Sequence, residues 1–289
     1  MTGRPTESVE DPGDHLSKDD HMGGMERLAM EVVSVARPFP SVARVTGRIS
    51  PTNVSVWRQP NLAVRIEVES PEGQRPVSRV YTIRSFDETE SRIEIDFVIH
   101  EDDSPAMRWL SETRAGACVH MIGPRPHFLP NYDNGKRIAL FADETAIPAV
   151  YAILQSWKPG AEGSIFIETA DRAAFDDLPD VAGVERHLLL RAESEPAGTT
   201  GRLVAAAKAL AVPQDWTVWA AGERNEARAI KKYFLEEQEL PKENVRVFGY
   251  WRKGVSSSEI DRMRLQRHAA RSGQEQALRP HEEDIDLPV

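Results

Sequence analysis

Residues 92–100 read Arg-Ile-Glu-Ile-Asp-Phe-Val-Ile-His, with an apolar side chain at every second position from Ile93 to Ile99. Alternation with a period of two is typical of a β-strand that has one face buried. Residues 64–68 repeat the pattern, and turn-forming residues at 71–73 and 87–90 separate the segments. Several short strands joined by such turns predict that residues 28–128 form an antiparallel barrel or sandwich, with one short helix at 105–113.

The pattern changes after the loop at 129–136, because apolar strand-like runs now alternate with helical segments. This alternation predicts a parallel sheet covered by helices on both faces. Ligands of such sheets bind at the carboxyl ends of the strands. We therefore expect a two-domain α+β chain, with a barrel at 26–134 and an α/β domain at 135–267. The predicted strands are 137–142, 164–169, 187–192, 217–221 and 245–250, and the predicted helices are 144–157, 201–210 and 224–237.

Charge is concentrated at the two ends of the chain. The formal net charge is -10, of which residues 1–25 carry -4 and residues 268–289 carry -3. We expect both acidic tails to be disordered. An acidic chain without a basic stripe argues against a nucleic-acid partner. The sequence has no apolar run long enough to span a membrane and no secretory signal, so we expect a cytoplasmic protein.

Cys118 is the single cysteine, so no internal disulfide can form. No group of Cys and His residues has the spacing of metal ligands, and we expect no metal site in the protein. Cys118 itself is predicted to be a free thiol buried in a barrel strand. Any iron that the protein handles would then arrive on a substrate.

Residues 79–84 read Arg-Val-Tyr-Thr-Ile-Arg. A flavin needs an aromatic wall for its ring, hydrogen-bond donors for its pyrimidine edge and a cation for its diphosphate. Arg79, Tyr81 and Thr82 offer these groups at strand spacing. The pattern alone favours a plain barrel strand with arginines that point outward, because aromatic residues are common in strands.

The 79–84 segment resembles the flavin-binding motif of the ferredoxin-reductase-like superfamily. Further matches narrow the resemblance to the siderophore-interacting protein family, which includes reductases similar to those of vibriobactin utilisation. The resemblance covers roughly residues 28–267. The matching segments are Asp96–His100, Pro105–Trp109, Gly123–Arg125, Asp143–Ala149, Ala221–Glu223 and Gly249–Gly254.

The resemblance implies non-covalent FAD and NADPH or NADH as the electron donor, with a ferredoxin left open as an alternative donor. The Asp143 turn reads independently as a helix cap with acidic residues in the first turn. Within the family it would face the flavin and the nicotinamide. The implied cofactor residues are Arg79, Tyr81, Thr82, Asp96, Val98, His100, Ala106, Trp109, Asp143, Thr145 and Ala146.

The resemblance also implies an anionic ferric siderophore as the substrate. Family positions that carry basic residues correspond here to Arg65, Arg125 and Arg252, and these arginines would form a positive pocket beside the flavin. The expected activity is therefore reduction of siderophore-bound iron without a side-chain nucleophile or base. Two alternatives stay open: a flavin reductase with another acceptor, such as a free ferric chelate, a ferredoxin or a quinone, and a siderophore-binding protein without activity.

Overall fold

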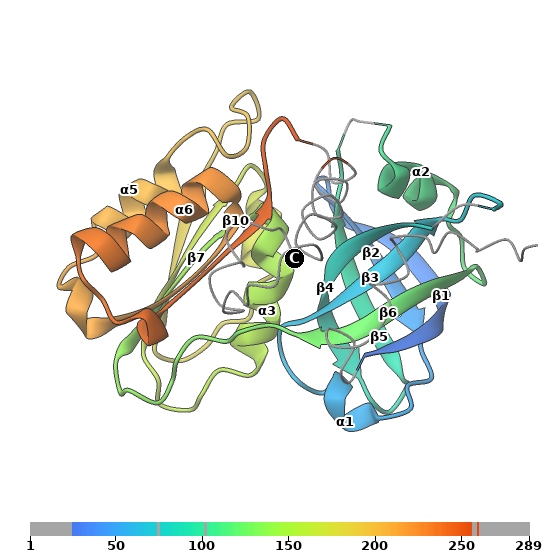
Figure 1. The fold of residues 1–289 in the computed structure, drawn as a ribbon, viewed down its shortest axis with the longest axis horizontal. Coiled ribbons are helices and arrows are strands. Elements are labelled where there is room, and N and C mark those ends of the chain that lie inside the picture. The colour runs from blue at the N-terminus through green and yellow to red at the C-terminus, as the bar shows by residue number, and fades with distance from the viewer. Residues whose placement is uncertain (1–24, 74–75, 101–102, 256–258, 260–289) are drawn as a thin grey trace, which may run out of the picture.

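A computed structural model describes residues 25–255, except 74–75 and 101–102, together with residue 259. Figure 1 shows two lobes, a barrel and an open sheet with helices, with α3 (Ile147–Gln155) at the junction between them. Among these residues no helix combines the length and the apolar character needed to cross a lipid bilayer. The two-domain α+β fold class predicted from the sequence is confirmed.

Six antiparallel strands close the barrel, in the order β1-β2-β5-β4-β3-β6. Alternating apolar side chains fill its interior; Ile93, Ile95 and Phe97 of β5, for example, are fully buried. The segments α1 (Val54–Trp57) and α2 (Pro105–Glu112) lie outside the ladder. The strands are β1 (Glu26–Phe39), β2 (Val42–Arg48), β3 (Leu62–Glu69), β4 (Val77–Asp87), β5 (Arg92–Val98) and β6 (Cys118–Pro126).

Five parallel strands form the second sheet, in the order β11-β10-β7-β8-β9. Its central strand β7 (Arg137–Asp143) is buried on both faces, as expected of a sheet covered by helices. Ile138 and Leu140 pack with α3 on one face, whereas Ala139 and Phe141 pack with helices α5 and α6 on the other. The remaining strands are β8 (Gly163–Thr169), β9 (Val184–Leu190), β10 (Trp216–Glu223) and β11 (Val245–Trp251).

The helices of this domain are short. Asp143 caps a 3-10 turn, η2 (Glu144–Ala146), from which α3 continues, and Pro148 is tolerated because it lies in the first turn of α3. The helix predicted at 224–237 changes its hydrogen bonding after Lys232 and ends as a π-helical turn. The other segments are α4 (Arg172–Asp176), α5 (Arg202–Lys208), η3 (Pro213–Asp215), α6 (Arg224–Lys232), η4 (Tyr233–Glu237) and η5 (Lys242–Asn244).

Two details correct the sequence-based expectations. Cys118 is exposed rather than buried, because β6 turns Val119 and Met121 inward and leaves Cys118 and His120 outside. Strand β9 begins at Val184 and ends at Leu190, not at 187–192; it is an edge strand, so its polar first residues need no burial. The proposed domain limits remain a prediction, and residues 1–24, 256–258 and 260–289 lie outside the described part.

Candidate active site

A cavity of about 1120 Å³ opens between the barrel and the carboxyl edge of the parallel sheet. Drug-sized ligands occupy pockets of roughly 300–1,000 Å³, so this space admits a larger ligand. Ten of the predicted site residues line it: Arg65, Arg79, Tyr81, Thr82, Asp96, Val98, His100, Ala106, Thr145 and Arg252. Trp109, Arg125, Asp143 and Ala146 are not among the lining residues.

Strand β4 supplies an aromatic and polar wall of the cavity. Arg79, Tyr81 and Thr82 all line it, and Arg79 Nη1 donates a hydrogen bond of 2.8 Å to the carbonyl of Ser78. The Tyr81 ring lies 4.1 Å from the Phe97 ring, and Trp109 stacks on Phe97 from 5.4 Å. Trp109 therefore supports the wall through Phe97 instead of facing the cavity.

The amino end of α2 forms the next part of the wall. Ser104 holds the N-cap position in an extended conformation, but its side chain makes no capping hydrogen bond, and Pro105 follows it. Ala106 and Met107 in the first turn line the cavity. Backbone N–H groups at a helix start have no partner within the helix, and the helix dipole favours an anion there. This end of the cavity can bind a phosphate.

Asp143 holds together the ends of three parallel strands. It is 3% exposed and accepts hydrogen bonds from the backbone N–H of Thr145 at 2.9 Å, that of Glu223 at 2.7 Å and the Trp251 indole N–H at 2.7 Å. Gly222 permits this close approach, since a Cβ there would lie 2.6 Å from Asp143 Oδ2. Burial raises the pKa of Asp143 despite these bonds. The residue organises the sheet edge behind the cavity wall.

More carboxylates gather around this edge. Burial, followed by the charge of Asp143, raises the pKa of Glu144 to about 7, although Arg191 pairs with Glu144. Burial and the charge of Glu168 raise the pKa of Glu226 to about 7. Glu144 and Arg191 line the cavity. In the described ranges, no group of His, Cys, Asp and Glu is arranged to hold a metal ion.

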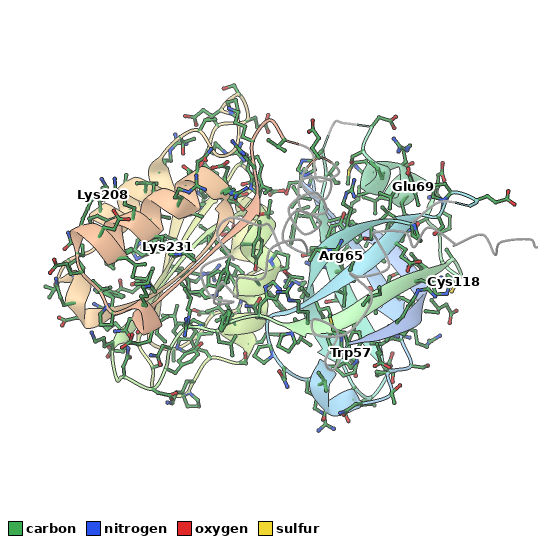
Figure 2. The ribbon with its side chains drawn as sticks, in the orientation of Figure 1. Trp57, Arg65, Glu69, Cys118, Lys208 and Lys231 are labelled. Carbon is green, nitrogen blue, oxygen red and sulfur yellow. The ribbon has the colours of Figure 1, made fainter. Side chains whose placement is uncertain are left out.

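Two of the three predicted substrate arginines line the cavity. Arg65, on β3, donates a 3.1 Å hydrogen bond to Ser78 Oγ, and Arg252 follows β11 from the opposite domain. Figure 2 places Arg65 on the side of the barrel that faces the sheet domain. Arg125 is exposed at the end of β6, opposite Ala63 of the adjacent strand β3. Lys253 adds a further cation to the lining.

Several lining residues were missed by the sequence analysis. Tyr250 and Trp251 lie at one of the predicted strand ends where a ligand is expected, but the sequence assigned neither of them a role in the site. Arg191 was missed because the predicted strand ran to residue 192, whereas β9 ends at Leu190. His127 gave no signal in the sequence; burial, and then the charge of Arg125, lower its pKa to about 4, so its ring is neutral at physiological pH.

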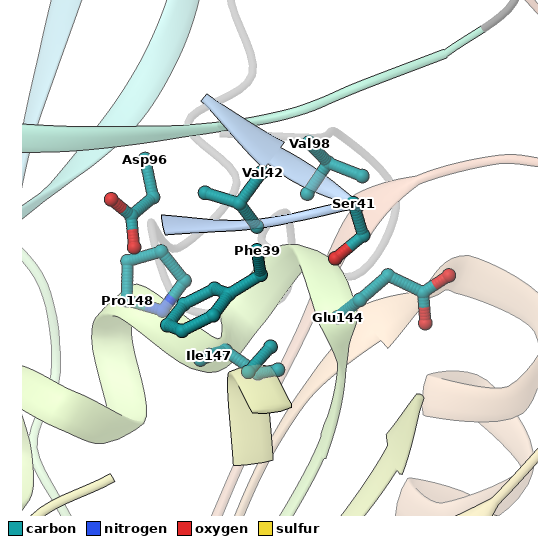
Figure 3. A pocket seen from close by; sticks show the side chains of 9 residues that line it. Phe39, Ser41, Val42, Asp96, Val98, Glu144, Ile147 and Pro148 are labelled. Atoms are coloured by element: carbon teal, nitrogen blue, oxygen red, sulfur yellow. The ribbon is translucent and has the colours of Figure 1, made fainter. Parts of the chain in front are cut away.

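A second hollow, of about 10 Å³, lies beside the main cavity between the barrel and α3. Figure 3 shows Val42, Asp96 and Val98 of the barrel facing Ile147 and Pro148. This volume holds one water molecule at most, so we assign no ligand to it.

Comparison with known proteins agrees with this geometry. The family described as "Siderophore-interacting FAD-binding domain" matches residues 50–128, and "Siderophore-interacting protein" matches residues 135–254. A ferric acinetobactin reductase from Acinetobacter baumannii is 44% identical over 287 residues, which are 99% of each chain.

Solved structures also relate this chain to siderophore-interacting proteins. The siderophore-interacting protein from Acinetobacter baumannii superimposes with a TM-score of 0.82 at 46% identity, over 86% of this chain and 99% of that one. A ferredoxin reductase of carbazole 1,9a-dioxygenase shares the fold alone, with a TM-score of 0.60 at 19% identity over 77% of this chain and 66% of that one. The resemblance found in the sequence is confirmed, and the chain belongs to the siderophore-interacting protein family.

Proposed function

We propose that this chain is an FAD-dependent reductase that takes electrons from NADPH or NADH and reduces ferric iron held by a siderophore. The observation that carries the proposal is the composition of the 1120 Å³ cavity. One wall offers aromatic, cationic and uncapped helix groups suited to FAD, and the other offers the strand ends of a parallel sheet. The relative that is 44% identical is a ferric acinetobactin reductase, and this supports the choice of substrate.

The residues of the barrel wall fit a bound FAD. Tyr81, held against Phe97, would stack on the flavin ring, while Thr82 would hydrogen-bond its polar edge. Arg79, His100 and the free N–H groups of α2 would hold the diphosphate. When bound, FAD supplies the redox chemistry, accepting a hydride from a nicotinamide and returning single electrons to iron. The side chains bind and orient the reactants.

Arg65 and Arg252 would hold the anionic substrate. They approach the cavity from different domains, so a ligand between them would contact the flavin wall and the sheet edge together. Reduced iron is bound far more weakly by hard oxygen donors than ferric iron, and release of the metal would follow reduction. We place this reaction in the cytoplasm, where the proposed dinucleotide donor is available.

The decisive test is an absorption spectrum of the purified protein recorded without oxygen. The flavin band is expected to bleach after NADPH or NADH is added and to return after a ferric siderophore is added. Bleaching without recovery would indicate a flavin reductase with a different acceptor. Failure to bleach with a dinucleotide, but bleaching with a reduced ferredoxin, would replace the proposed donor. A protein that binds no FAD would refute the proposal.

The substrate pocket has its own test. Changing Arg65 and Arg252 together to alanine is expected to raise the KM for an anionic ferric siderophore at least tenfold and to leave the FAD content unchanged. Arg48→Ala is the matched control, because Arg48 is exposed on β2, pairs with Glu31 at 3.4 Å and does not line the cavity. Arg125→Ala should have a smaller effect than the double variant, since Arg125 does not line the cavity. An unchanged KM in the double variant would refute the assignment of this pocket to the siderophore.

A further inference from the structure

Arg84 ends the 79–84 motif but takes no part in the cavity described above. It lies two residues after Thr82 on β4 and is 2% exposed, yet it is not among the residues that line the cavity. A guanidinium is always charged in proteins, and a buried charge is costly unless it is paired. The partners of Arg84 therefore indicate what this residue does.

The partners of Arg84 come from both domains. Its Nη1 lies 3.3 Å from Asp96 Oδ2 on the neighbouring barrel strand, and its Nη2 donates to Asp177, the C-cap residue that follows α4 in the sheet domain. The guanidinium carbon also lies 3.4 Å from the centre of the Tyr151 ring on α3. A single barrel side chain thus binds one carboxylate of its own domain, one carboxylate of the other domain and an aromatic ring of the other domain.

Arg44 completes the arrangement. Its Nε and Nη2 bind the two oxygens of Asp96 at 2.7 and 3.0 Å, and Nη2 also lies 3.4 Å from Asp177. Burial, the largest single influence, lowers the pKa of Arg44, but the hydrogen bonds to Asp96 and the charges of Asp96, Glu94 and Asp177 together outweigh it and raise the pKa, so the charge is retained. We call Arg44, Arg84, Asp96 and Asp177 the seam network. Its two positive and two negative charges balance.

A second contact lies on the same seam. Ser41 donates two hydrogen bonds to Asp171 Oδ2, from its hydroxyl at 2.6 Å and from its backbone N–H at 3.1 Å. Ser41 belongs to the barrel and Asp171 to the sheet domain, and both line the main cavity. Figure 3 shows Ser41 and Asp96 on the barrel side of this seam, opposite Pro148 of α3. Asp96, one member of the seam network, also lines the main cavity, so the network reaches the cavity wall there.

Ion pairs of this kind determine geometry more than they add stability. Desolvation offsets most of the attraction in a buried ion pair, whereas removal of one partner costs roughly 3–5 kcal/mol because the other charge is left buried. Domains within one chain are expected to move relative to each other unless their interface is large and apolar. A directional, charge-balanced junction limits that motion to one orientation.

We infer that the seam network is a positioning device and that Arg84 is its central residue: it fixes the orientation of the sheet edge relative to the flavin-binding wall. This inference rests on the proposed function, in which the donor and the flavin meet in the cavity between these two surfaces. Arg84 would act through Asp177 and Tyr151 rather than through contact with a reactant. Its loss should change how the two walls face each other and leave each wall intact.

The orientation of the domains can be measured directly. Cys118 is exposed on the barrel, and Lys208→Cys adds a second thiol on α5; Figure 2 shows these positions at opposite ends of the molecule. Spin labels on both thiols of the FAD-loaded protein report the distance between domains by electron paramagnetic resonance. Arg84→Met is expected to shift or broaden the distance distribution, Arg84→Lys to do so less, and Arg48→Met to leave it unchanged.

A kinetic measurement connects this orientation to function. At saturating NADPH or NADH, the limiting rate of flavin bleaching should fall about 10- to 100-fold in Arg84→Met, the scale expected when reactants are misplaced by about 1 Å. The Kd for FAD should change less than the rate. Partial recovery in Arg84→Lys would support a positioning role, since lysine restores the charge without the planar fork.

The outcomes separate the two hypotheses. An unchanged distance distribution together with an unchanged bleaching rate in Arg84→Met would overturn the inference. If this variant does not fold, Asp177→Asn weakens the network from its more exposed member, which is 35% exposed, and the same two results decide. If the wild-type flavin is not bleached by any dinucleotide, the proposed function fails, while the distance measurement still decides whether the seam network orients the domains.

Discussion

Tyr81 is oriented before any ligand arrives. Its ring lies 4.1 Å from Phe97, and Phe97 stacks on Trp109 at 5.4 Å, so three rings form a continuous support behind the cavity wall. A side chain that is already ordered loses little conformational entropy when it binds a ligand. This explains how Trp109 can matter for the site without lining it.

Replacement of Tyr81 by alanine tests this support. Stacking of a base on an aromatic side chain is worth roughly 1–3 kcal/mol, and we expect a similar loss for a flavin ring. The Kd for FAD in Tyr81→Ala should rise about 10- to 100-fold, measured by titrating flavin fluorescence in the apoprotein. Tyr81→Phe keeps the ring and should bind FAD within a few-fold of wild type. Equal affinity in wild type and Tyr81→Ala would show that the flavin does not stack there.

The sequence predicted which residue types form the site but not which way each side chain points. The 79–84 motif identified Arg79, Tyr81 and Thr82, which all line the cavity. It did not show that Asp143 and Ala146 face inward, because a helix cap and a ligand contact look identical in the sequence. Cys118 was wrongly predicted to be buried for a related reason. Alternation shows which residues of a strand share a face, but only the packed structure shows which of the two faces is buried.

At the scale of elements, α2 begins without a side-chain cap. Ser104 occupies the N-cap position and its carbonyl accepts a 3.0 Å hydrogen bond from the Arg108 N–H, but its side chain makes no capping hydrogen bond. Serine usually makes this bond, and replacing such a cap typically costs 0.5–2 kcal/mol. The first turn of α2 lines the large cavity through Ala106 and Met107, and a ligand there would meet the amino end of the helix.

Ser104→Asp should affect the stability of α2 and the binding of FAD in opposite directions. Aspartate is a good N-cap and its charge suits the helix dipole, so the melting temperature of the apoprotein should stay equal or rise. The added carboxylate would repel a bound diphosphate, and we expect the Kd for FAD to rise about tenfold, or ~1.4 kcal/mol. Ser104→Asn caps without charge and is the control. If FAD binds Ser104→Asp and Ser104→Asn equally well, the diphosphate lies elsewhere.

Element boundaries were predicted less well than element types. All five strands of the parallel sheet were expected, but β9 was placed too late because its first residues, Val184 to Arg186, read as a polar loop. An edge strand tolerates such residues, and edge position is a property of the whole sheet rather than of the segment. The error hid Arg191, the first residue after the strand.

At the scale of the whole molecule, the sequence predicted the two folds and did not predict how they meet. Arg44, Arg84, Asp96 and Asp177 are separated by up to 133 residues, and no local pattern connects them. Each residue looks like an ordinary surface charge. Only the packed structure shows that Arg84 is buried between the domains. The orientation of two domains is therefore encoded in long-range pairs that a single sequence does not reveal.

The acidic sheet edge makes the stability of the whole molecule depend on pH. Burial and the charge of Glu168 raise the pKa of Glu226 to about 7, from an ordinary value near 4.5. Between these two values the folded protein holds a proton that the unfolded chain has released. Stability therefore falls as the pH rises through this window. Each tenfold change in proton affinity corresponds to about 1.4 kcal/mol, so the loss from one such carboxyl is about 1–3 kcal/mol.

Glu226→Gln should remove this loss. The amide oxygen can still accept the hydrogen bond that Gly201 N–H donates to Glu226 at 3.0 Å, and the neutral side chain carries no charge into the buried cluster. We expect the FAD-loaded variant to melt near the wild-type temperature at pH 5 and above it at pH 8. Glu236→Gln, at an exposed position on η4, should reproduce the wild-type profile. Parallel melting profiles for wild type and Glu226→Gln would mean that Glu226 is already ionised throughout this range, and that the arginines of the sheet edge neutralise its charge.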